Sequence, residues 1–413
     1  MQFDYKENFA HEMDEKDPLR SFRERFLIPR TKNGKEVVYL VGNSLGLQPK
    51  KAGNYIQQEL EDWANLGVRG HMNAKNPWYA YHELVTESLA KIVGAKPHEV
   101  VAMNSLTTNL HLMMVSFYRP TSKKFKIVIE PGAFPSDQYA VTSQIKFHGF
   151  DPKEALLEID SDNILETLKV NGDAIALVMI GNVNFRTGEA FDIKGITKVA
   201  HQKNCMVGFD LAHGAGNLSL KLHDDGPDFA VWCNYKYLNG GPGTIGGCFV
   251  HERHASNPKL PRFAGWWGYD KTTRFELKSN FVPMQGIEGW QLSNPPIFQL
   301  AALRASMEIF DDAGMDKIFS KRDQLTAYLE FCLNQLPKDY VQILTPKNPK
   351  KRGCQLSFRI QGNPSEIVKN LDPEGFFCDF REPDILRVAP VPLYNRFHDV
   401  FSFAKKLEGY AQK

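Results

Sequence analysis

Two side chains capable of covalent and acid–base chemistry stand at the ends of neighbouring predicted strands. Asp210 ends the apolar segment CMVGFD (205–210), and Lys236 follows the apolar segment FAVWCN (229–234). In open α/β sheets the carboxyl ends of the strands present groups to ligands. An aspartate alone more often caps a helix, and a lysine alone more often lies in a solvated turn. Together the two residues predict a site in which an amine and a carboxylate act on one ligand.

The residues around Lys236 favour a covalent role for its amine. Tyr235 and Tyr237 flank the lysine, and partial desolvation between them would favour the neutral amine that imine formation needs. In enzymes that use pyridoxal phosphate, a lysine forms a Schiff base with the cofactor. An aspartate keeps the ring nitrogen protonated, which makes the ring an electron sink. Lys236 and Asp210 therefore predict pyridoxal phosphate as the cofactor.

Two upstream segments supply what such a cofactor needs besides the lysine. EVVAMNSLTTNLHLMM (99–114) begins a helix at residues 105–108, where free N–H groups and the Thr107 hydroxyl could hold a phosphate or simply cap the helix. KIVIEPGAFPSDQYA (126–140) places Phe134 past a strand end, where its ring could stack on a pyridine face or belong to the core. Ser136 and Asp137 follow, and could bond the ring substituents or the phosphate, or cap the next helix.

Two glycine motifs have functional spacings but favour other interpretations. GPGTIG (241–246) has the GxGxxG spacing of dinucleotide-binding proteins, yet that motif must open a helix, and here the strand-like GCFVHE (247–252) follows. We expect a glycine-rich turn between two strands. GNSLG (42–46) has the GxSxG spacing of a serine-hydrolase nucleophile elbow at Ser44. Too little chain precedes it for the strand that would supply an oxyanion hole, so serine hydrolysis stays a minor alternative.

Histidines and cysteines lack the spacing that is typical of metal sites. The six cysteines form no CxxC pair, which favours reduced thiols in a cytoplasmic protein. No HExxH or facial-triad spacing links the histidines to acids, so no metal is expected. The residues weighed for a metal site are His201, His213, His223, Asp210, Asp224 and Asp225.

Short apolar runs that alternate with helical patterns must position these residues. The alternation predicts an α/β sheet, and the continuous apolar runs are typical of parallel strands buried on both faces. Strands are expected at 36–41, 99–103, 126–130, 174–180, 205–210, 229–234, 247–252, 354–360 and 386–391. Helices are expected at 54–66, 78–94, 108–118, 193–204 and, as one long helical region, 299–336.

Three regions are expected along the chain. Residues 46–297 would form a large cofactor-binding α/β domain that carries the predicted strands around Asp210 and Lys236. After the proline-rich SNPPIF, residues 298–413 would form a smaller α+β domain, on which an N-terminal arm of residues 1–45 packs.

Composition and charge exclude several classes of protein. The 413 residues carry a net charge of +2, with 42% apolar and 24% charged residues, which is ordinary globular usage. This balance predicts neither a nucleic-acid nor a membrane partner. The N-terminus MQFDYKENFAHEMDEKD is acidic where a signal peptide would be basic, and no apolar run approaches the ~18 residues of a membrane span. We expect a cytoplasmic protein with a small-molecule substrate.

Six motifs follow one another along most of the chain. They are GNSLGLQPK (42–50), FPSD (134–137), FDLAHGAGN (209–217), WCNYKYLNGGPG (232–243), SNPPI (293–297) and RVAPVPLYNRFHDV (387–400). Together they resemble kynureninase, a family of fold-type I pyridoxal phosphate enzymes. The resemblance implies a mostly parallel seven-stranded sheet in the large domain, a smaller α+β domain, and a homodimer.

The resemblance also implies a cofactor site, residue by residue. Lys236 would carry the covalent link to pyridoxal phosphate, Tyr235 would contact the phosphate, and Asp210 would pair with the pyridine nitrogen. Gly181 stands where many relatives have serine, so any contact there would be made by backbone. The further cofactor-binding residues are Leu106, Thr107, Phe134, Pro135, Ser136, Asp137, His213, Asn294 and Trp266, the last contributed across the dimer interface.

A substrate site and a reaction follow from the same resemblance. The reaction is hydrolytic Cβ–Cγ cleavage of L-kynurenine or 3-hydroxykynurenine to L-alanine and anthranilate or 3-hydroxyanthranilate, in tryptophan catabolism and NAD biosynthesis. Lys236 would act as general base and acid, with Tyr235 as a proton relay and Asp210 as the third catalytic residue. Arg387 would grip the α-carboxylate with two parallel N–H donors. The remaining substrate-binding residues are Asn43, Ser44, His71, Ser293 and Asn294, of which the last three favour 3-hydroxykynurenine.

Two other functions stay open. One is a different fold-type I enzyme, such as an aminotransferase or a cysteine desulfurase. A desulfurase has glutamine in place of His213 and needs a loop cysteine as nucleophile, whereas Cys354 and Cys378 are expected to be structural. The other is a catalytically silent homologue that only binds a ligand or partner. The imine-forming Lys236 argues against that function, because a binding module has no need of it.

Overall fold

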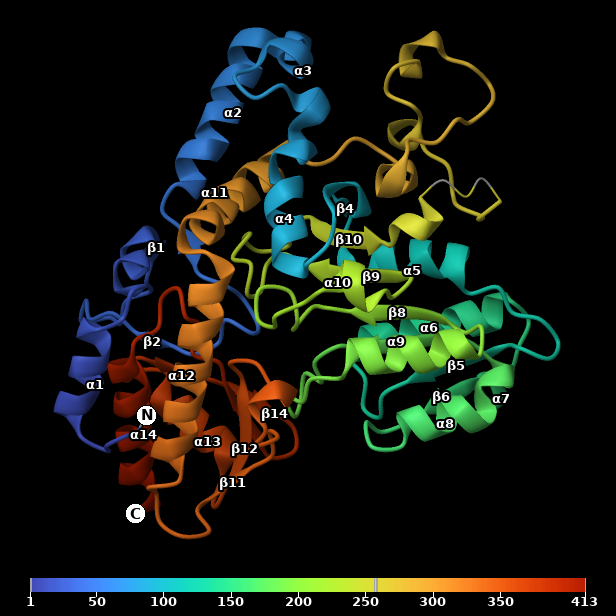
Figure 1. Cartoon of the computed structure of the whole chain (residues 1–413). Helices are drawn as coiled ribbons and strands as arrows, with labels where there is room; N and C mark the ends of the chain where they lie inside the picture. The colour runs from blue at the N-terminus through green and yellow to red at the C-terminus, as the bar shows by residue number, and fades with distance from the viewer. Residues whose placement is uncertain (1, 256, 258, 413) are drawn as a thin grey trace.

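A seven-stranded sheet forms the centre of the chain (Figure 1). The computed structural model describes residues 2–255, 257 and 259–412. The strands lie in the order β4-β10-β9-β8-β7-β5-β6. β10 is antiparallel to both of its neighbours, and the pairs from β9 to β6 are parallel, which confirms the predicted mostly parallel sheet. The bounds are β4 (Val100–Ala102), β5 (Lys126–Ile129), β6 (Leu156–Glu158), β7 (Ile175–Gly181), β8 (Met206–Asp210), β9 (Phe229–Cys233) and β10 (Gly246–Val250).

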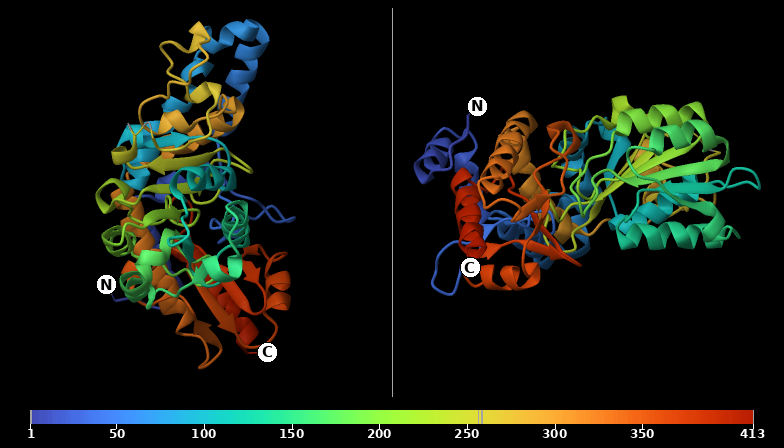
Figure 2. Two further views of the ribbon diagram at one scale, coloured as in Figure 1. Left: turned by 90° about the vertical axis from the view of Figure 1, so that its right-hand side faces the viewer. Right: turned by 90° about the horizontal axis from the view of Figure 1, so that it is seen from below.

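Helices cover both faces of this sheet. In the right-hand view of Figure 2, α8 and α9 lie on one side of the strands and α5 and α6 on the other. Apolar side chains of α4, α8, α9 and α11 share one buried cluster, and those of α5 and α6 belong to a second. The bounds are α2 (Ala52–Leu66), α3 (Gly70–Asn73), α4 (Thr86–Val93), α5 (Leu106–Phe117), α6 (Pro135–Phe147), α7 (Pro152–Ala155), α8 (Ile164–Asn171), α9 (Ile193–Gln202), α10 (Leu222–Asp225) and α11 (Ile297–Ala313).

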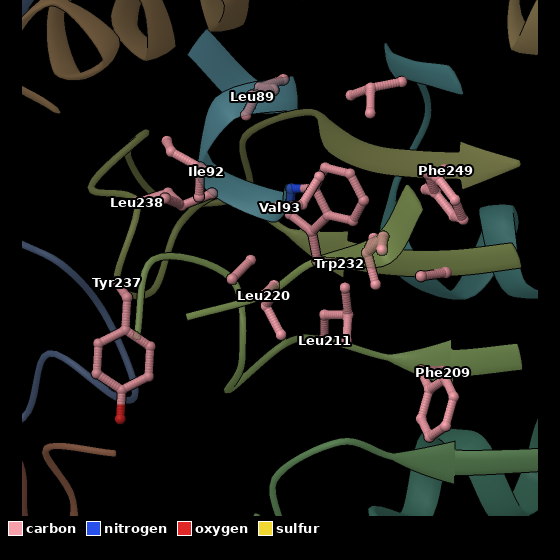
Figure 3. Close-up of a cluster of buried hydrophobic side chains, with 14 of the residues drawn as sticks. Leu89, Ile92, Val93, Phe209, Leu211, Leu220, Trp232, Tyr237, Leu238 and Phe249 are labelled. Atoms are coloured by element: carbon pink, nitrogen blue, oxygen red, sulfur yellow. The ribbon is translucent and has the colours of Figure 1, made fainter. Parts of the chain in front are cut away.

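Aromatic side chains on the central strands pack against glycines of the neighbouring strands. Trp232 on β9 is fully buried in the cluster that Figure 3 shows, together with Phe209 and Phe249. Gly247 on β10 pairs with Trp232, and a Cβ atom there would lie 2.1 Å from the indole ring. Because protein cores are close-packed, this position accepts no side chain without displacing the ring.

A second, antiparallel sheet forms near the C-terminus, in the order β11-β12-β15-β14. Its strands and the helices α12 and α14 bury one common apolar cluster, which confirms the smaller α+β unit. Among the helices of the described residues, none is both long and apolar enough to cross a membrane. The bounds are β11 (Val341–Ile343), β12 (Leu356–Ile360), β14 (Asp379–Arg381), β15 (Ile385–Val388), α12 (Met315–Leu333), α13 (Pro364–Leu371) and α14 (Phe397–Ala411).

The N-terminal residues lie against this C-terminal part. Ala10 and Met13 of α1 (Glu7–Glu15) are buried in the same cluster as α14. Asp17 and Lys321 form a buried ion pair with an N–O distance of 2.6 Å. The strand β2 (Val38–Tyr39) adds to this contact by pairing with β13 (Phe376–Phe377). The strand β1 (Phe26–Leu27) pairs instead with β3 (Gln48–Pro49). The boundaries 1–45, 46–297 and 298–413 stay predictions.

Three expected elements differ from the structure. The helical region 299–336 is two helices, because Gly314 has a φ of +78° in the left-handed region, which breaks the helix between α11 and α12. The expected helix 78–94 begins as the 3-10 segment Trp78–Val85, with non-helical dihedrals at Ala80, before α4 continues it. The expected strand 36–41 is reduced to the two residues of β2.

Candidate functional site

A cavity lies at the carboxyl ends of β5, β7 and β8. These three strands are neighbours in the sheet, so the residues that follow them meet at one edge. The helices α5 and α6 begin at the same cavity, since Thr107 and Ser136 from their first turns line it. The lining residues are Leu106, Thr107, Glu130, Phe134, Ser136, Asp137, Gly181, Val183, Phe185, Asp210, Ala212, His213, Tyr235 and Lys236.

Lys236 lies beside His213 in this cavity. Its Nζ atom is 3.0 Å from His213 Nε2 and 5.8 Å from the centroid of the Phe134 ring. Burial, together with the positive charge of Lys236, holds the pKa of His213 well below its ordinary value. The imidazole is therefore neutral and accepts a hydrogen bond from the lysine. His213 Nδ1 is buried and has no hydrogen-bond partner.

Three carboxyl groups share the cavity with this single lysine. Burial raises the pKa of Asp210, although the backbone N–H of Ala212 donates to its Oδ1 atom at 2.6 Å. The pKa of Asp137 is raised well above its ordinary value by burial and by the neighbouring Asp210. Like charges in one poorly solvated site disfavour one another, so these carboxyl groups lose their protons less readily than free carboxyl groups do.

Glu130 is the third acid, and the sequence analysis did not name it. It is 3% exposed and directly follows β5. The backbone N–H of Gly181 donates to its Oε2 atom at 3.0 Å, and burial raises its pKa to about 7. A Cβ atom on Gly181 would lie 2.6 Å from Glu130 Oε1, so the glycine leaves room for the carboxyl. The sequence does indicate Glu130, because this acid stands at the end of an apolar run, as Asp210 does.

The first turns of α5 and α6 are joined by their side chains. Thr107 Oγ1 and Ser136 Oγ are 2.7 Å apart. Pro135 occupies the first position of α6, where its missing N–H costs no hydrogen bond. Two helix N-termini that meet at one cavity offer several free N–H groups and two hydroxyls to an anion.

The segment 42–46 packs against the backbone of Tyr235 and Lys236 and does not form a nucleophile elbow. The Gly46 N–H donates to Tyr235 O at 2.8 Å, and a Cβ atom on Gly46 would lie 2.3 Å from Lys236 O. Ser44 Oγ donates to Asp379 Oδ2 at 2.9 Å and has no histidine partner among its hydrogen bonds. The hydrolase alternative thus lacks its base. GPGTIG forms the turn between the antiparallel β9 and β10, as expected.

Arg387 is 1% exposed and touches the cavity through Phe185. Its Nη1 atom donates to the carbonyl oxygen of Phe185 at 2.7 Å, and Nη2 pairs with Asp379. The Asn43 side chain donates to Gln355 Oε1 at 3.0 Å, and Gln355 donates in turn to Phe185 O at 3.1 Å. Asn43, Ser44 and Arg387 are therefore brought together behind Phe185.

Eight predicted site residues do not line this cavity: Pro135, the residues Asn43, Ser44 and Arg387 described above, and four others. His71 lies in α3 with its ring against Trp78, at a centroid distance of 5.5 Å. Trp266 is 48% exposed and packs edge-on against Phe275. Ser293 and Asn294 are exposed in the segment before α11. The chain by itself leaves these side chains outside the cavity that holds Lys236.

Neither Cys354 nor Cys378, the two cysteines considered as nucleophiles of a desulfurase, supports that function. Burial raises the pKa of Cys354 and of Cys378 to about 12 each. A thiol nucleophile reacts as the thiolate, so neither residue has the form that a desulfurase requires. Both fit the structural role that the sequence predicts.

Comparisons with known proteins place the chain in a family. The family model for the kynureninase C-terminal domain matches residues 318–407. A kynureninase of Myxococcus xanthus is 60% identical, in an alignment that covers 100% of this chain and 99% of the relative. A kynureninase of Koribacter versatilis is 57% identical, covering 98% and 97%. A C-DES mutant with glycine covalently linked to its PLP cofactor has the same fold, with a TM-score of 0.78 at 17% identity over 94% of this chain and 98% of that one. The chain therefore belongs to the kynureninase family.

Proposed function

We propose that the protein is a pyridoxal phosphate-dependent kynureninase. It would cleave the Cβ–Cγ bond of L-kynurenine and 3-hydroxykynurenine with water, and release L-alanine with anthranilate or 3-hydroxyanthranilate. The relatives with 60% and 57% identity support this activity. The observation that carries the proposal is the Lys236 amine, which shares one cavity with the Asp210 carboxyl and the exposed face of Phe134.

The residues of the cavity fit pyridoxal phosphate. The paired N-termini of α5 and α6, with the Thr107 and Ser136 hydroxyls, are suited to the phosphate. The Nδ1 atom of His213 and the Oδ1 atom of Asp137 are buried and have no hydrogen-bond partner among the described residues, so a ligand would supply one. Asp210 would hold the proton on the ring nitrogen and Phe134 would cover one ring face. When bound, the cofactor supplies an electron sink for negative charge that develops next to the amino-acid nitrogen.

The protein's own groups would then handle the protons of the reaction. Lys236 Nζ would take a proton from the α-carbon of the substrate and later donate that proton to another atom. The neutral His213 imidazole would accept a hydrogen bond from Nζ and so orient the amine. Burial raises the pKa of Tyr235, so its phenol keeps its proton and can donate it to the β-carbon that the cleavage leaves. Arg387 would bind the α-carboxylate and fix the substrate.

We further propose a homodimer with a preference for 3-hydroxykynurenine. His71, Ser293, Asn294 and Trp266 do not line the cavity of their own chain. In a dimer, these residues would reach the cavity of the partner. A polar site built around the ring hydroxyl would leave buried groups unpaired with plain kynurenine, which penalises that substrate. We also propose a cytoplasmic location, which the six free cysteines support.

The decisive experiment combines trapping with product analysis. Borohydride treatment of the holoenzyme is expected to attach the cofactor to Lys236, and Lys236→Ala is expected to abolish both this labelling and aryl acid release from either substrate. Lys198→Ala, which changes an exposed lysine of α9, serves as the control and should behave as wild type. A protein that stays colourless with pyridoxal phosphate would overturn the proposal.

Substrate preference is tested separately. The wild type is expected to show a higher kcat/KM for 3-hydroxykynurenine than for kynurenine, and His71→Ala is expected to reduce that ratio by about tenfold, the effect of roughly one lost hydrogen bond. Equal kcat/KM values for the two substrates, unchanged in His71→Ala, would refute the preference and leave the activity itself intact.

A further inference from the structure

The guanidinium of Arg387 is paired inside the protein, yet one of its donors is left over. Arg387 Nη2 contacts Asp379 and lies 3.3 Å from Ser44 Oγ, and Nη1 donates to Phe185 O. The Nε–H group is buried and has no hydrogen-bond partner. Unpartnered buried donors are rare in native proteins. This free Nε–H donor points to an acceptor that a ligand supplies.

Asp379 collects hydrogen bonds from three side chains on one oxygen. Its Oδ2 atom accepts from Ser44 at 2.9 Å and from Arg381 at 3.0 Å, and also contacts Arg387 Nη2. Asp379 is the residue paired with Arg387 across the β14–β15 ladder, so the backbone holds the two side chains beside each other. An aspartate with three donors on one oxygen has little freedom to move.

The charges of this group sum to one positive charge. Arg381 and Arg387 contribute two positive charges and Asp379 contributes one negative charge. The Arg381 side chain is 44% exposed, so water solvates part of its charge, whereas the Arg387 side chain is only 2% exposed. A carboxylate from a ligand would be attracted by the net positive charge of the group and could accept a hydrogen bond from the Nε–H of Arg387.

We propose that Asp379, held by Ser44, is the positioning residue for the carboxylate-binding Arg387. Asp379 fixes the Nη2 end of the guanidinium, which sets the plane in which the free Nε–H group is offered to the α-carboxylate of the substrate. The inference rests on the proposed function and deepens it, because it assigns a support to the arginine that would recognise an α-amino acid. Displacing a recognition group by about 1 Å can cost up to 100-fold in rate or binding.

The test separates carboxylate recognition from general damage. Asp379→Asn keeps the shape of the side chain and removes its charge. In the holoenzyme we expect KM for L-kynurenine to rise about tenfold or more, with kcat within about threefold of wild type. The matched probe is the amine that carries hydrogen in place of the α-carboxylate, used as a competitive inhibitor. Its inhibition constant is expected to change less than about twofold, since it does not use Arg387.

Two further variants complete the design. Asp384→Asn removes an acid that precedes β15 and pairs with the half-exposed Arg359. This control variant is expected to leave the KM for L-kynurenine and the inhibition constant of the amine unchanged. Ser44→Ala removes only the hydroxyl that holds Asp379, and is expected to raise KM about threefold if Asp379→Asn proves too unstable to assay.

Each outcome has a distinct meaning. If Asp379→Asn raised the KM for the substrate and the inhibition constant of the carboxylate-free amine by the same factor, the role of Asp379 would be merely structural and the inference would be overturned. An unchanged or lowered KM would also overturn it, the latter because Asp379 would then compete with the substrate for Arg387. A wild-type holoenzyme that releases no aryl acid would instead refute the proposed function, before any variant is compared.

Discussion

Replacing Glu130 by glutamine is expected to stabilise the cofactor-free protein above neutral pH and to have little effect in acid. Glu130 is 3% exposed and its pKa is about 7, against an ordinary value of 4.5. Below pH 4.5 both the folded and the unfolded chain hold the proton. Between pH 4.5 and 7 only the folded chain holds it, so stability falls as the pH rises through this range. Above pH 7 the folded protein carries the full cost of a buried charge.

The magnitude follows from the two pKa values. At 1.36 kcal/mol per pH unit, the difference between 4.5 and about 7 corresponds to roughly 3 kcal/mol. Glutamine cannot ionise, and its carbonyl oxygen can still accept the Gly181 N–H. Its added NH₂ group needs an acceptor of its own, which offsets part of the gain. We therefore expect Glu130→Gln to raise the free energy of unfolding by about 1–3 kcal/mol at pH 8.

Urea unfolding at several pH values between 4.5 and 8 measures this effect. The advantage of Glu130→Gln over wild type should grow through this range and level off above pH 7. Glu158→Gln changes an exposed neighbour at the end of β6 and should show no such trend. A stabilisation that is equal at all pH values, or a loss of stability at pH 8, would refute the argument from the buried charge.

Two other predictions concern stability away from the cavity. Gly247→Ala places a Cβ atom 2.1 Å from the Trp232 ring, so it should lower the free energy of unfolding measured in urea by about 1–3 kcal/mol. The control Gly409→Ala lies in open space on α14 and should leave that free energy unchanged or raise it by up to about 1 kcal/mol. Although burial alone would raise it, hydrogen bonds from His201 and His254 hold the pKa of Asp228 well below its ordinary range. Asp228→Asn should therefore lower the free energy of unfolding by about 3 kcal/mol at pH 7. The gap to wild type should narrow as the pH falls below about 4, because Asp228 then takes up a proton in the unfolded wild-type chain while it stays ionised in the folded protein; a gap that is constant with pH would contradict this.

Buried strands were predicted well because burial on both faces leaves a continuous apolar run. The expected strand 174–180 and the observed β7 (Ile175–Gly181) differ by one residue at each end. The edge strand β6 was not expected, since its three residues are only partly buried or exposed and form no such run. The break at Gly314 was not expected either, because a glycine within a long helical pattern is often tolerated, and only the backbone shows its positive φ.

Strand ends also explain which site residues the sequence could find. Asp210 and Lys236 follow apolar runs, and the sheet order brings their strands next to each other. Glu130 follows the run KIVI in the same way and could have been named by the same reasoning. The pairing of Arg387 with Asp379 could not, because it depends on the register between β14 and β15 in a different sheet. No residue spacing indicates that register.

The charges of the cavity determine which way a ligand lies in it. At one end, Thr107 and Ser136 belong to helix N-termini, which favour an anion such as a phosphate. Burial is the largest cause of the raised pKa values of the three acids, and the charge of Lys236 lowers those of Asp137 and Asp210. A protonated ring nitrogen would supply a further cationic partner for Asp210 and lower the cost of its charge. Pyridoxal phosphate carries its anion and its basic nitrogen on different sides of one ring, so we expect the helix N-termini to hold its phosphate and Asp210 to hold its ring nitrogen. Lys236 lines the same cavity as the three acids, so the placement of the acids matters to the chemistry together with the lysine.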